Sequence, residues 1–89
     1  MPSPSVSEGT IHAVIAAITA ETGKTVTADT NLVEDLGLDS LEIVSLELTM
    51  AREFELKEVP YIPKDMQTVR DIAAVIQQLM IDEGKPGAA

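Results

Sequence analysis

Ser40 is the side chain whose type and position could best support chemistry. It follows a short loop that ends in Leu38 and Asp39, and a helical pattern begins directly after it, so we expect Ser40 at the first helical position. There its hydroxyl would face solvent beside unpaired backbone N–H groups and the positive end of the helix dipole, which would stabilise an attached phosphodiester. The carboxylates of Asp39 and Glu42 would offset part of this gain. From these residues alone, ordinary helix capping is the simpler interpretation.

Other catalytic and metal sites are poorly supported by the residues. A serine hydrolase would need a general base, and the single histidine, His12, lies early in the first expected helix beside Ile11, where we expect it to be solvated. The sequence contains no cysteine, which removes disulfides, thiolate metal sites and a cysteine nucleophile. A calcium loop starting at Asp29 would place Val33 at its fifth position and Ser40 at its twelfth, where oxygen ligands are needed. We therefore expect neither an enzyme nor a metal site.

Length and charge narrow the function further. Eighty-nine residues, 45% of them hydrophobic, form one small domain whose single core leaves little room for a catalytic cavity. Fifteen acidic residues against six basic ones give a net charge of −9, so nucleic acid and anionic membranes would repel the chain. Nine of the carboxylates fall within residues 29–58, which predicts basic partners. With no signal peptide and no apolar run long enough to span a membrane, we expect a soluble, cytoplasmic monomer.

The apolar periodicity predicts an all-α fold, an irregular four-helix bundle with three longer helices and one short, degenerate third helix. The first helix would begin near Ser5, which has the spacing of a capping box with Glu8, or two residues later. Gly23 is a plausible left-handed stop. A loop of about fifteen residues follows, which is long for a compact domain. We expect Leu32 and Leu36 to hold this loop against the core.

The later helices have clear start signals. Asp39 and Thr68 each have an acidic residue three positions later, the spacing of a capping box, so they would start the second and last helices. Two prolines restrict the short third helix, within residues 59–66, to one distorted turn. The expected organisation is a flexible tail (1–4), one folded domain (5–82) and a second flexible tail (83–89).

The second helix carries two apolar stripes, more than one core requires. One stripe would face the core, and the other lies roughly 120° around the helix. Their members are Ile43, Leu46, Met50 and Phe54 in the first stripe, and Leu41, Val44, Leu48 and Ala51 in the second. The helix is therefore either central in the bundle or exposes one stripe, and an exposed stripe normally marks an interaction site.

The end of the loop before the second expected helix, together with that helix, resembles the attachment region of acyl carrier proteins. The residues that carry this resemblance are Asp35-Leu36-Gly37-Leu38-Asp39-Ser40-Leu41-Glu42, followed by a helix that ends in Glu53-Phe54. Length, acidity and helix spacing agree over about residues 8–81. The resemblance implies a free-standing carrier, not an enzyme, in which Ser40 receives 4′-phosphopantetheine from coenzyme A with Asp39 and Leu41 beside it. Acyl groups would then be held as thioesters on the thiol of the arm.

The resemblance also implies how the chain meets its partners. In such carriers the second helix is the docking surface for enzymes with basic patches. The implied partners are a phosphopantetheinyl transferase, an acyl-ACP synthetase or acyltransferase, a ketosynthase and other acyl-processing enzymes. The residues expected to contact them are Leu41, Glu42, Val44, Ser45, Leu48 and Arg52. The residues expected, from their helix positions, to line an acyl pocket are Ile43, Glu47, Met50 and Ile62.

Three features depart from the usual pattern of the family. Ser45 and Arg52 stand where fatty-acid carriers commonly present glutamates, Glu47 stands where an apolar residue is typical, and residues 59–66 are short and doubly prolyl. Within fatty-acid, polyketide or specialised lipid biosynthesis, they favour a dedicated pathway over a housekeeping one. A peptidyl or D-alanyl carrier, which shares the arm and the serine, is an open alternative, and so is an unmodified acidic helical adaptor.

Overall fold

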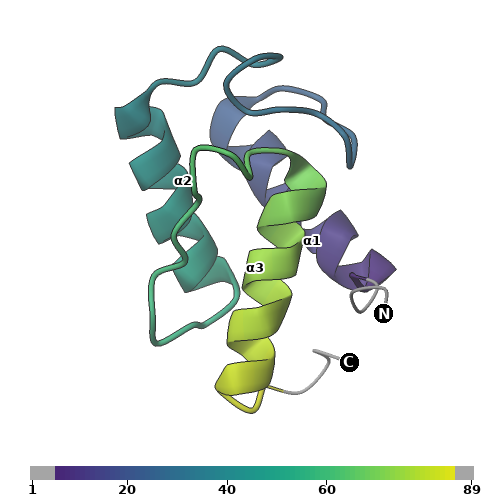
Figure 1. Ribbon diagram of the computed structural model, residues 1–89, viewed down its shortest axis with the longest axis vertical. Helices are drawn as coiled ribbons and strands as arrows, with labels where there is room; N and C mark the ends of the chain where they lie inside the picture. Colours follow the sequence, from purple (N-terminus) through teal and green to yellow (C-terminus); the bar gives the residue numbers. More distant parts are fainter. Residues whose placement is uncertain (1–5, 86–89) are drawn as a thin grey trace.

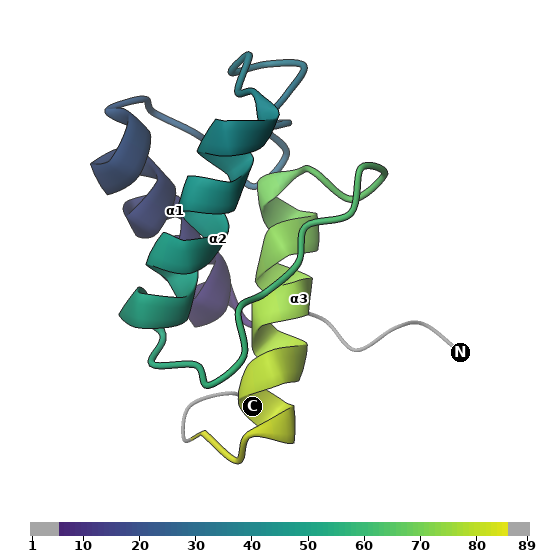
Figure 2. The same ribbon diagram turned by 90° about the vertical axis from the view of Figure 1, so that its left-hand side faces the viewer.

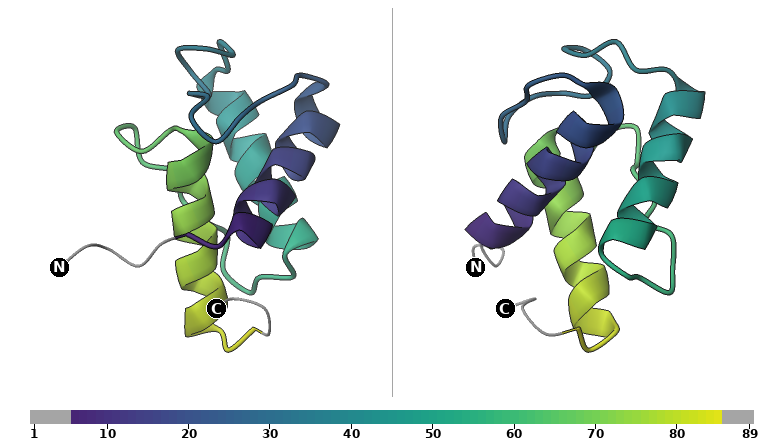
Figure 3. Two further views of the ribbon diagram at one scale, coloured as in Figure 1. Left: turned by 90° about the vertical axis from the view of Figure 1, so that its right-hand side faces the viewer. Right: turned by 180° about the vertical axis from the view of Figure 1, so that it is seen from behind.

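The structure, a computed structural model, describes residues 6–85. Within that range the chain forms three helices, α1 (Glu8–Thr22), α2 (Ser40–Glu53) and α3 (Val69–Asp82). α1 packs against both α2 and α3 (Figure 1). Seen from behind, α1 crosses α3 and α2 lies to one side of the pair (Figure 3). The predicted all-α class is therefore confirmed.

The helix ends follow local signals in the sequence. Gly23 adopts a left-handed conformation with φ of 73° directly after α1, as predicted. Asp39 and Thr68 each form a complete capping box at the start of α2 and α3. α1 begins directly after Ser7, whose side chain makes no capping hydrogen bond. Ser5, the other predicted starting point, lies outside the described residues.

One apolar core lies between the helices and is built almost entirely from aliphatic side chains. Burial of each such side chain contributes about 1.5–3 kcal/mol of hydrophobic stabilisation. The helix residues at its centre are Ile11, Val14 and Ile18 of α1, Ile43, Leu46 and Met50 of α2, and Val69, Ile72 and Ile76 of α3. The core stripe predicted for the second helix is therefore the buried one, with Phe54 partly buried beside it.

The loop between α1 and α2 is tied to the start of α3. Leu32 is fully buried, as predicted, and its N–H donates to the carbonyl of Gln67 at 2.9 Å. Asn31 and Thr68 form an isolated antiparallel β-bridge beside this bond. Leu36 packs on the core while partly exposed. These contacts hold the loop in a defined place just before α2 begins.

The fourth helix of the predicted bundle is absent, because residues 54–68 form no helix and the described chain has three helices. This segment runs between α2 and α3 (Figure 2). Pro60 and Pro63 supply no N–H for a helical hydrogen bond. The N–H of Ile62 donates to the side chain of Glu47 on α2. A single turn closes further on, where Met66 donates its N–H to the carbonyl of Pro63 at 3.1 Å.

Hydrogen-bonded structure continues beyond residue 82, where the folded domain was expected to end. The carboxylate of Glu83 accepts hydrogen bonds from the N–H groups of Lys57, at 2.9 Å, and Glu58, at 3.2 Å. The N–H of Lys85 donates to the carbonyl of Met80 at 2.8 Å. The remaining parts of the two predicted tails, residues 1–4 and 86–89, lie outside the described range.

Candidate functional site

Ser40 is the first residue of α2, and its side chain is exposed. The capping box surrounds it: Asp39 Oδ1 accepts from the N–H of Glu42 at 2.8 Å, and Glu42 Oε1 accepts from the N–H of Asp39 at 3.0 Å. Both neighbouring carboxylates are thus bonded to the backbone. The hydroxyl of Ser40 makes no hydrogen bond to any residue between 6 and 85. It is an exposed hydroxyl on a well-capped helix end, open to modification.

The loop before Ser40 is fixed in place by the backbone. Gly37 has φ of 70°, a left-handed conformation that side chains with a Cβ rarely adopt. Leu38 is buried, and its N–H donates to the carbonyl of Leu32 at 3.1 Å. Lys24 Nζ donates to the carbonyl of Leu36 at 3.0 Å. Ser40 follows the buried Leu38 by two residues, and the burial of Leu38 fixes the position of Ser40 relative to the core.

A groove of about 510 Å³ opens beside Ser40, between α2 and residues 61–67; we call it the Ser40 groove. Its lining residues are Val33, Leu38, Asp39, Ser40, Ile43, Val44, Glu47, Tyr61, Ile62, Lys64 and Gln67. Three of the four residues predicted to line an acyl pocket, Ile43, Glu47 and Ile62, therefore lie together on its wall. Met50 does not line it, because its side chain is fully buried in the core.

Glu47 is buried in spite of its charge, with 8% of its surface exposed. Its Oε2 accepts a hydrogen bond from the backbone N–H of Ile62 at 2.7 Å. On the helical wheel, Glu47 lies between the two apolar stripes of α2. The structure shows that it lines the Ser40 groove and bonds to the segment opposite α2.

The second apolar stripe of α2 is largely exposed. Leu41, Val44 and Leu48 have exposed fractions of 78%, 49% and 54%, whereas Ala51 is partly buried against the core. α2 is therefore not central in the bundle, and it presents an apolar face that begins directly after Ser40. Exposed apolar faces of this kind commonly mark interaction sites.

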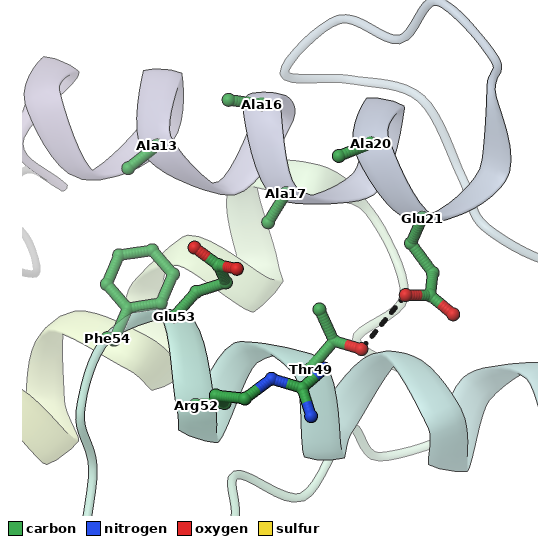
Figure 4. A pocket seen from close by; sticks show the side chains of 9 residues that line it. All are labelled: Ala13, Ala16, Ala17, Ala20, Glu21, Thr49, Arg52, Glu53 and Phe54. Carbon is green, nitrogen blue, oxygen red and sulfur yellow. Dashed lines mark hydrogen bonds between the residues drawn. The ribbon is translucent and has the colours of Figure 1, made fainter.

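Glu21 of α1 adds a carboxylate beside this face, which the sequence pattern did not reveal. Its Oε2 accepts from the hydroxyl of Ser45 at 3.1 Å, and its Oε1 accepts from the hydroxyl of Thr49 at 3.0 Å. Figure 4 shows the bond to Thr49 at one end of a second groove, of about 520 Å³, between α1 and α2. Arg52 lines that groove as well, on the same side of α2 as Thr49.

Comparison with known proteins accords with this geometry. Residues 9–76 match the family described as "Phosphopantetheine attachment site". Proteins named acyl carrier protein are similar to the chain over much of their length. The one from Akkermansia muciniphila is 30% identical over 79 residues, which cover 89% of this chain and 98% of the relative. The chain belongs to the acyl carrier protein family.

Two further acyl carrier proteins support this membership. The relative from the Onion yellows phytoplasma is 35% identical over 66 residues, covering 74% of this chain and 87% of that protein. The relative from Bdellovibrio bacteriovorus is 36% identical over 53 residues, covering 60% of this chain and 68% of the relative. The prosthetic group of this carrier is therefore covalently attached 4′-phosphopantetheine. In residues 6–85 of this carrier, no helix is long and apolar enough to cross a membrane.

Proposed function

We propose that Ser40 carries the 4′-phosphopantetheine arm and that the chain holds acyl groups on this arm for partner enzymes. The observation that carries the proposal is the exposed Ser40 hydroxyl, which makes no hydrogen bond within residues 6–85. When bound, the arm supplies the thiol on which acyl groups are held as thioesters. The sequence has no cysteine, so no protein thiol competes for them.

The residues around Ser40 fit a phosphodiester. The first four N–H groups of a helix have no intrahelical acceptor. In α2 the capping box satisfies those of Asp39 and Glu42 and leaves those of Ser40 and Leu41. They lie at the positive end of the helix dipole, which favours an attached anion. Asp39 would contribute by capping α2, and we propose that it also lies beside the metal ion and coenzyme A during arm transfer.

We propose that the exposed face of α2 is the docking surface. Leu41, Val44 and Leu48 supply apolar contact area next to the arm. Charge complementarity chiefly sets partner choice and association rate, so the acidic surroundings favour enzymes with basic patches. The proposed partners are a phosphopantetheinyl transferase, an acyl-ACP synthetase or acyltransferase, and a ketosynthase. Glu42, Ser45 and Arg52 would lie at the edge of this contact.

The cargo is proposed to be an acyl intermediate of fatty-acid, polyketide or specialised lipid biosynthesis in the cytoplasm. The names of the three relatives favour acyl cargo over a peptidyl or D-alanyl one. Ile43, Glu47 and Ile62 are the residues that we propose to contact the tethered group, because all three line the groove into which Ser40 opens. The chain itself is proposed to be a carrier and not a catalyst.

Incubation with coenzyme A and a promiscuous phosphopantetheinyl transferase tests the attachment residue. We expect intact-protein mass spectrometry to show one added phosphopantetheine on the wild type and on Thr19→Ala, and none on Ser40→Ala. Thr19→Ala is the control, because it removes an exposed hydroxyl from α1, which holds none of the proposed contact residues. A wild type that stays unmodified would instead favour the unmodified adaptor. If Ser40→Ala is still modified, the arm is attached to a residue other than Ser40.

A further inference from the structure

Glu47 places a carboxylate in the wall of a groove in which half of the other lining residues are aliphatic. The aliphatic residues are Val33, Leu38, Ile43, Val44 and Ile62, and the others are Asp39, Ser40, Tyr61, Lys64 and Gln67. Ser40 lies in the same groove, seven residues before Glu47 along α2, which is roughly 10 Å at 1.5 Å per residue. A group tethered to Ser40 and lying in the groove would therefore pass Glu47.

The two oxygens of Glu47 differ in their surroundings. Oε2 accepts the N–H of Ile62 at 2.7 Å. No donor from residues 6–85 reaches Oε1. The side chain as a whole is 8% exposed, so the groove is the route by which Oε1 reaches water or a ligand. Oε1 is thus an acceptor available to whatever occupies the groove.

An occupant made only of hydrocarbon would be disfavoured at this point. It would take Oε1 out of water without giving a hydrogen bond in return, and a buried charged group without a partner is costly. An occupant that carries an N–H or O–H at this depth would replace the lost water by a charge-assisted hydrogen bond, which is among the stronger ones in proteins. The carboxylate of Glu47 therefore favours an occupant that carries an N–H or O–H over one made only of hydrocarbon.

We propose that Glu47 is a specificity-determining residue: it makes the Ser40 groove a site for a tethered group with a hydrogen-bond donor and selects against an unbroken saturated acyl chain. This inference rests on the proposed attachment at Ser40. The donor has two possible sources, an amide N–H of the pantetheine arm or a hydroxyl of the acyl cargo. Both use the same acceptor, Glu47 Oε1.

The test compares wild type with two variants of Glu47. Glu47→Gln has nearly the same shape and keeps an oxygen for the N–H of Ile62 and a polar groove wall. Glu47→Leu makes the wall apolar. Each protein is prepared in the apo form, with the arm alone, and with octanoyl or 3-hydroxyoctanoyl on the arm, and loading is verified by mass. Absence of loading would refute the attachment proposal, separately from the inference about Glu47.

Two measurements are independent of any partner enzyme. They are the NMR chemical shift of the backbone amide of Ile62, compared with the apo form, and the midpoint temperature of thermal unfolding. For the wild type we expect the 3-hydroxyoctanoyl form to melt higher than the octanoyl form when the cargo hydroxyl is the donor, and for Glu47→Leu we expect the opposite order. In Glu47→Gln the remaining oxygen accepts the N–H of Ile62 and an amide NH2 replaces the acceptor Oε1, so we expect the difference between the two forms to shrink. A wild-type Ile62 shift with the arm alone would identify the arm amide as the donor, and a shift only with 3-hydroxyoctanoyl would identify the cargo hydroxyl.

Three results would overturn the inference. The first is the same order of thermal midpoints in wild type and Glu47→Leu. The second is a wild-type octanoyl form as stable as the 3-hydroxyoctanoyl form together with no Ile62 shift in the form that carries the arm alone, a comparison that stands even if Glu47→Leu fails to fold. The third is an Ile62 amide that shifts in none of the loaded forms.

Discussion

The carboxylate of Glu47 accepts the backbone N–H of Ile62 at 2.7 Å and so joins α2 to the segment that leads to α3. Ile62 lies between Pro60 and Pro63, in a stretch that forms no helix. Its N–H is buried, and a buried N–H without an acceptor is costly. The side chain of Glu47 on α2 thus supplies the acceptor for a buried N–H in a segment that forms no helix.

Replacing Glu47 by alanine should therefore destabilise the fold. Loss of the acceptor leaves the N–H of Ile62 unpaired, for which we expect a decrease of about 1–3 kcal/mol in the free energy of unfolding. Urea denaturation measures this decrease. Glu47→Gln, which keeps an oxygen in place, should lose clearly less. An alanine variant as stable as the wild type would show that this hydrogen bond contributes nothing to stability.

Asp39 should contribute to stability through its capping role alone. Asp39→Ala removes the acceptor for the N–H of Glu42 and should lower the free energy of unfolding by about 1 kcal/mol. Asp39→Ser keeps a capping oxygen and should retain most of this stability. If Asp39 also lies beside the metal ion during arm transfer, the serine variant will be stable and yet modified slowly. Equal transfer rates for Asp39→Ser and wild type would remove that second role.

Leu41 and Leu46 are the same residue type on opposite sides of α2, one 78% exposed and the other fully buried. Leu41→Ala should change the free energy of unfolding by less than about 0.5 kcal/mol. Leu46→Ala creates a cavity in the core and should cost about 2–5 kcal/mol. In contrast, Leu41→Ala should slow arm transfer by the transferase, because it removes apolar contact area beside Ser40. If Leu41→Ala lowers stability as much as Leu46→Ala, the assignment of the docking face is wrong.

The helix starts were predictable because their signals are local. A capping box needs only two side chains three residues apart, so Asp39 and Thr68 could be recognised from spacing alone. The position of Ser40 at the start of α2 follows directly from the first of these. Gly23 could be recognised for the same reason, since a left-handed helix stop depends on one residue.

The remaining features depend on contacts between distant residues. The pattern of α2 shows two apolar stripes but not which neighbours cover them, and only the packing on α1 shows that the Leu41 stripe is exposed. Met50 was assigned to the pocket from its helix position, although its side chain points into the core. The bonds from Glu21 to Ser45 and Thr49 join residues 24 and 28 positions apart, and no local pattern signals them.

Glu83 should make the stability of the fold depend on pH. The N–H of Lys57 is the main cause that holds the pKa of this carboxyl below its usual value of 4.5, and the N–H of Glu58 adds to it. A group whose pKa is lower in the folded state stabilises the fold fully above its unfolded pKa, and this stabilisation is lost as the pH falls through the folded pKa. The contribution of Glu83 should therefore be complete at neutral pH and be lost progressively as the pH falls from 4.5 through the lower pKa of the folded state.

Glu83→Gln tests this pH dependence against the wild type. At pH 7 the variant should be modestly less stable, because the neutral amide accepts the two N–H groups more weakly than the carboxylate does. The difference between the two proteins should shrink as the pH falls below 4.5, when the wild-type carboxyl is protonated as well. Urea denaturation over a pH series measures it, and taking the difference cancels the other carboxylates. Glu53→Gln, whose side chain makes no hydrogen bond within residues 6–85, should show no such trend, and a Glu83→Gln difference that is constant with pH would contradict the assignment.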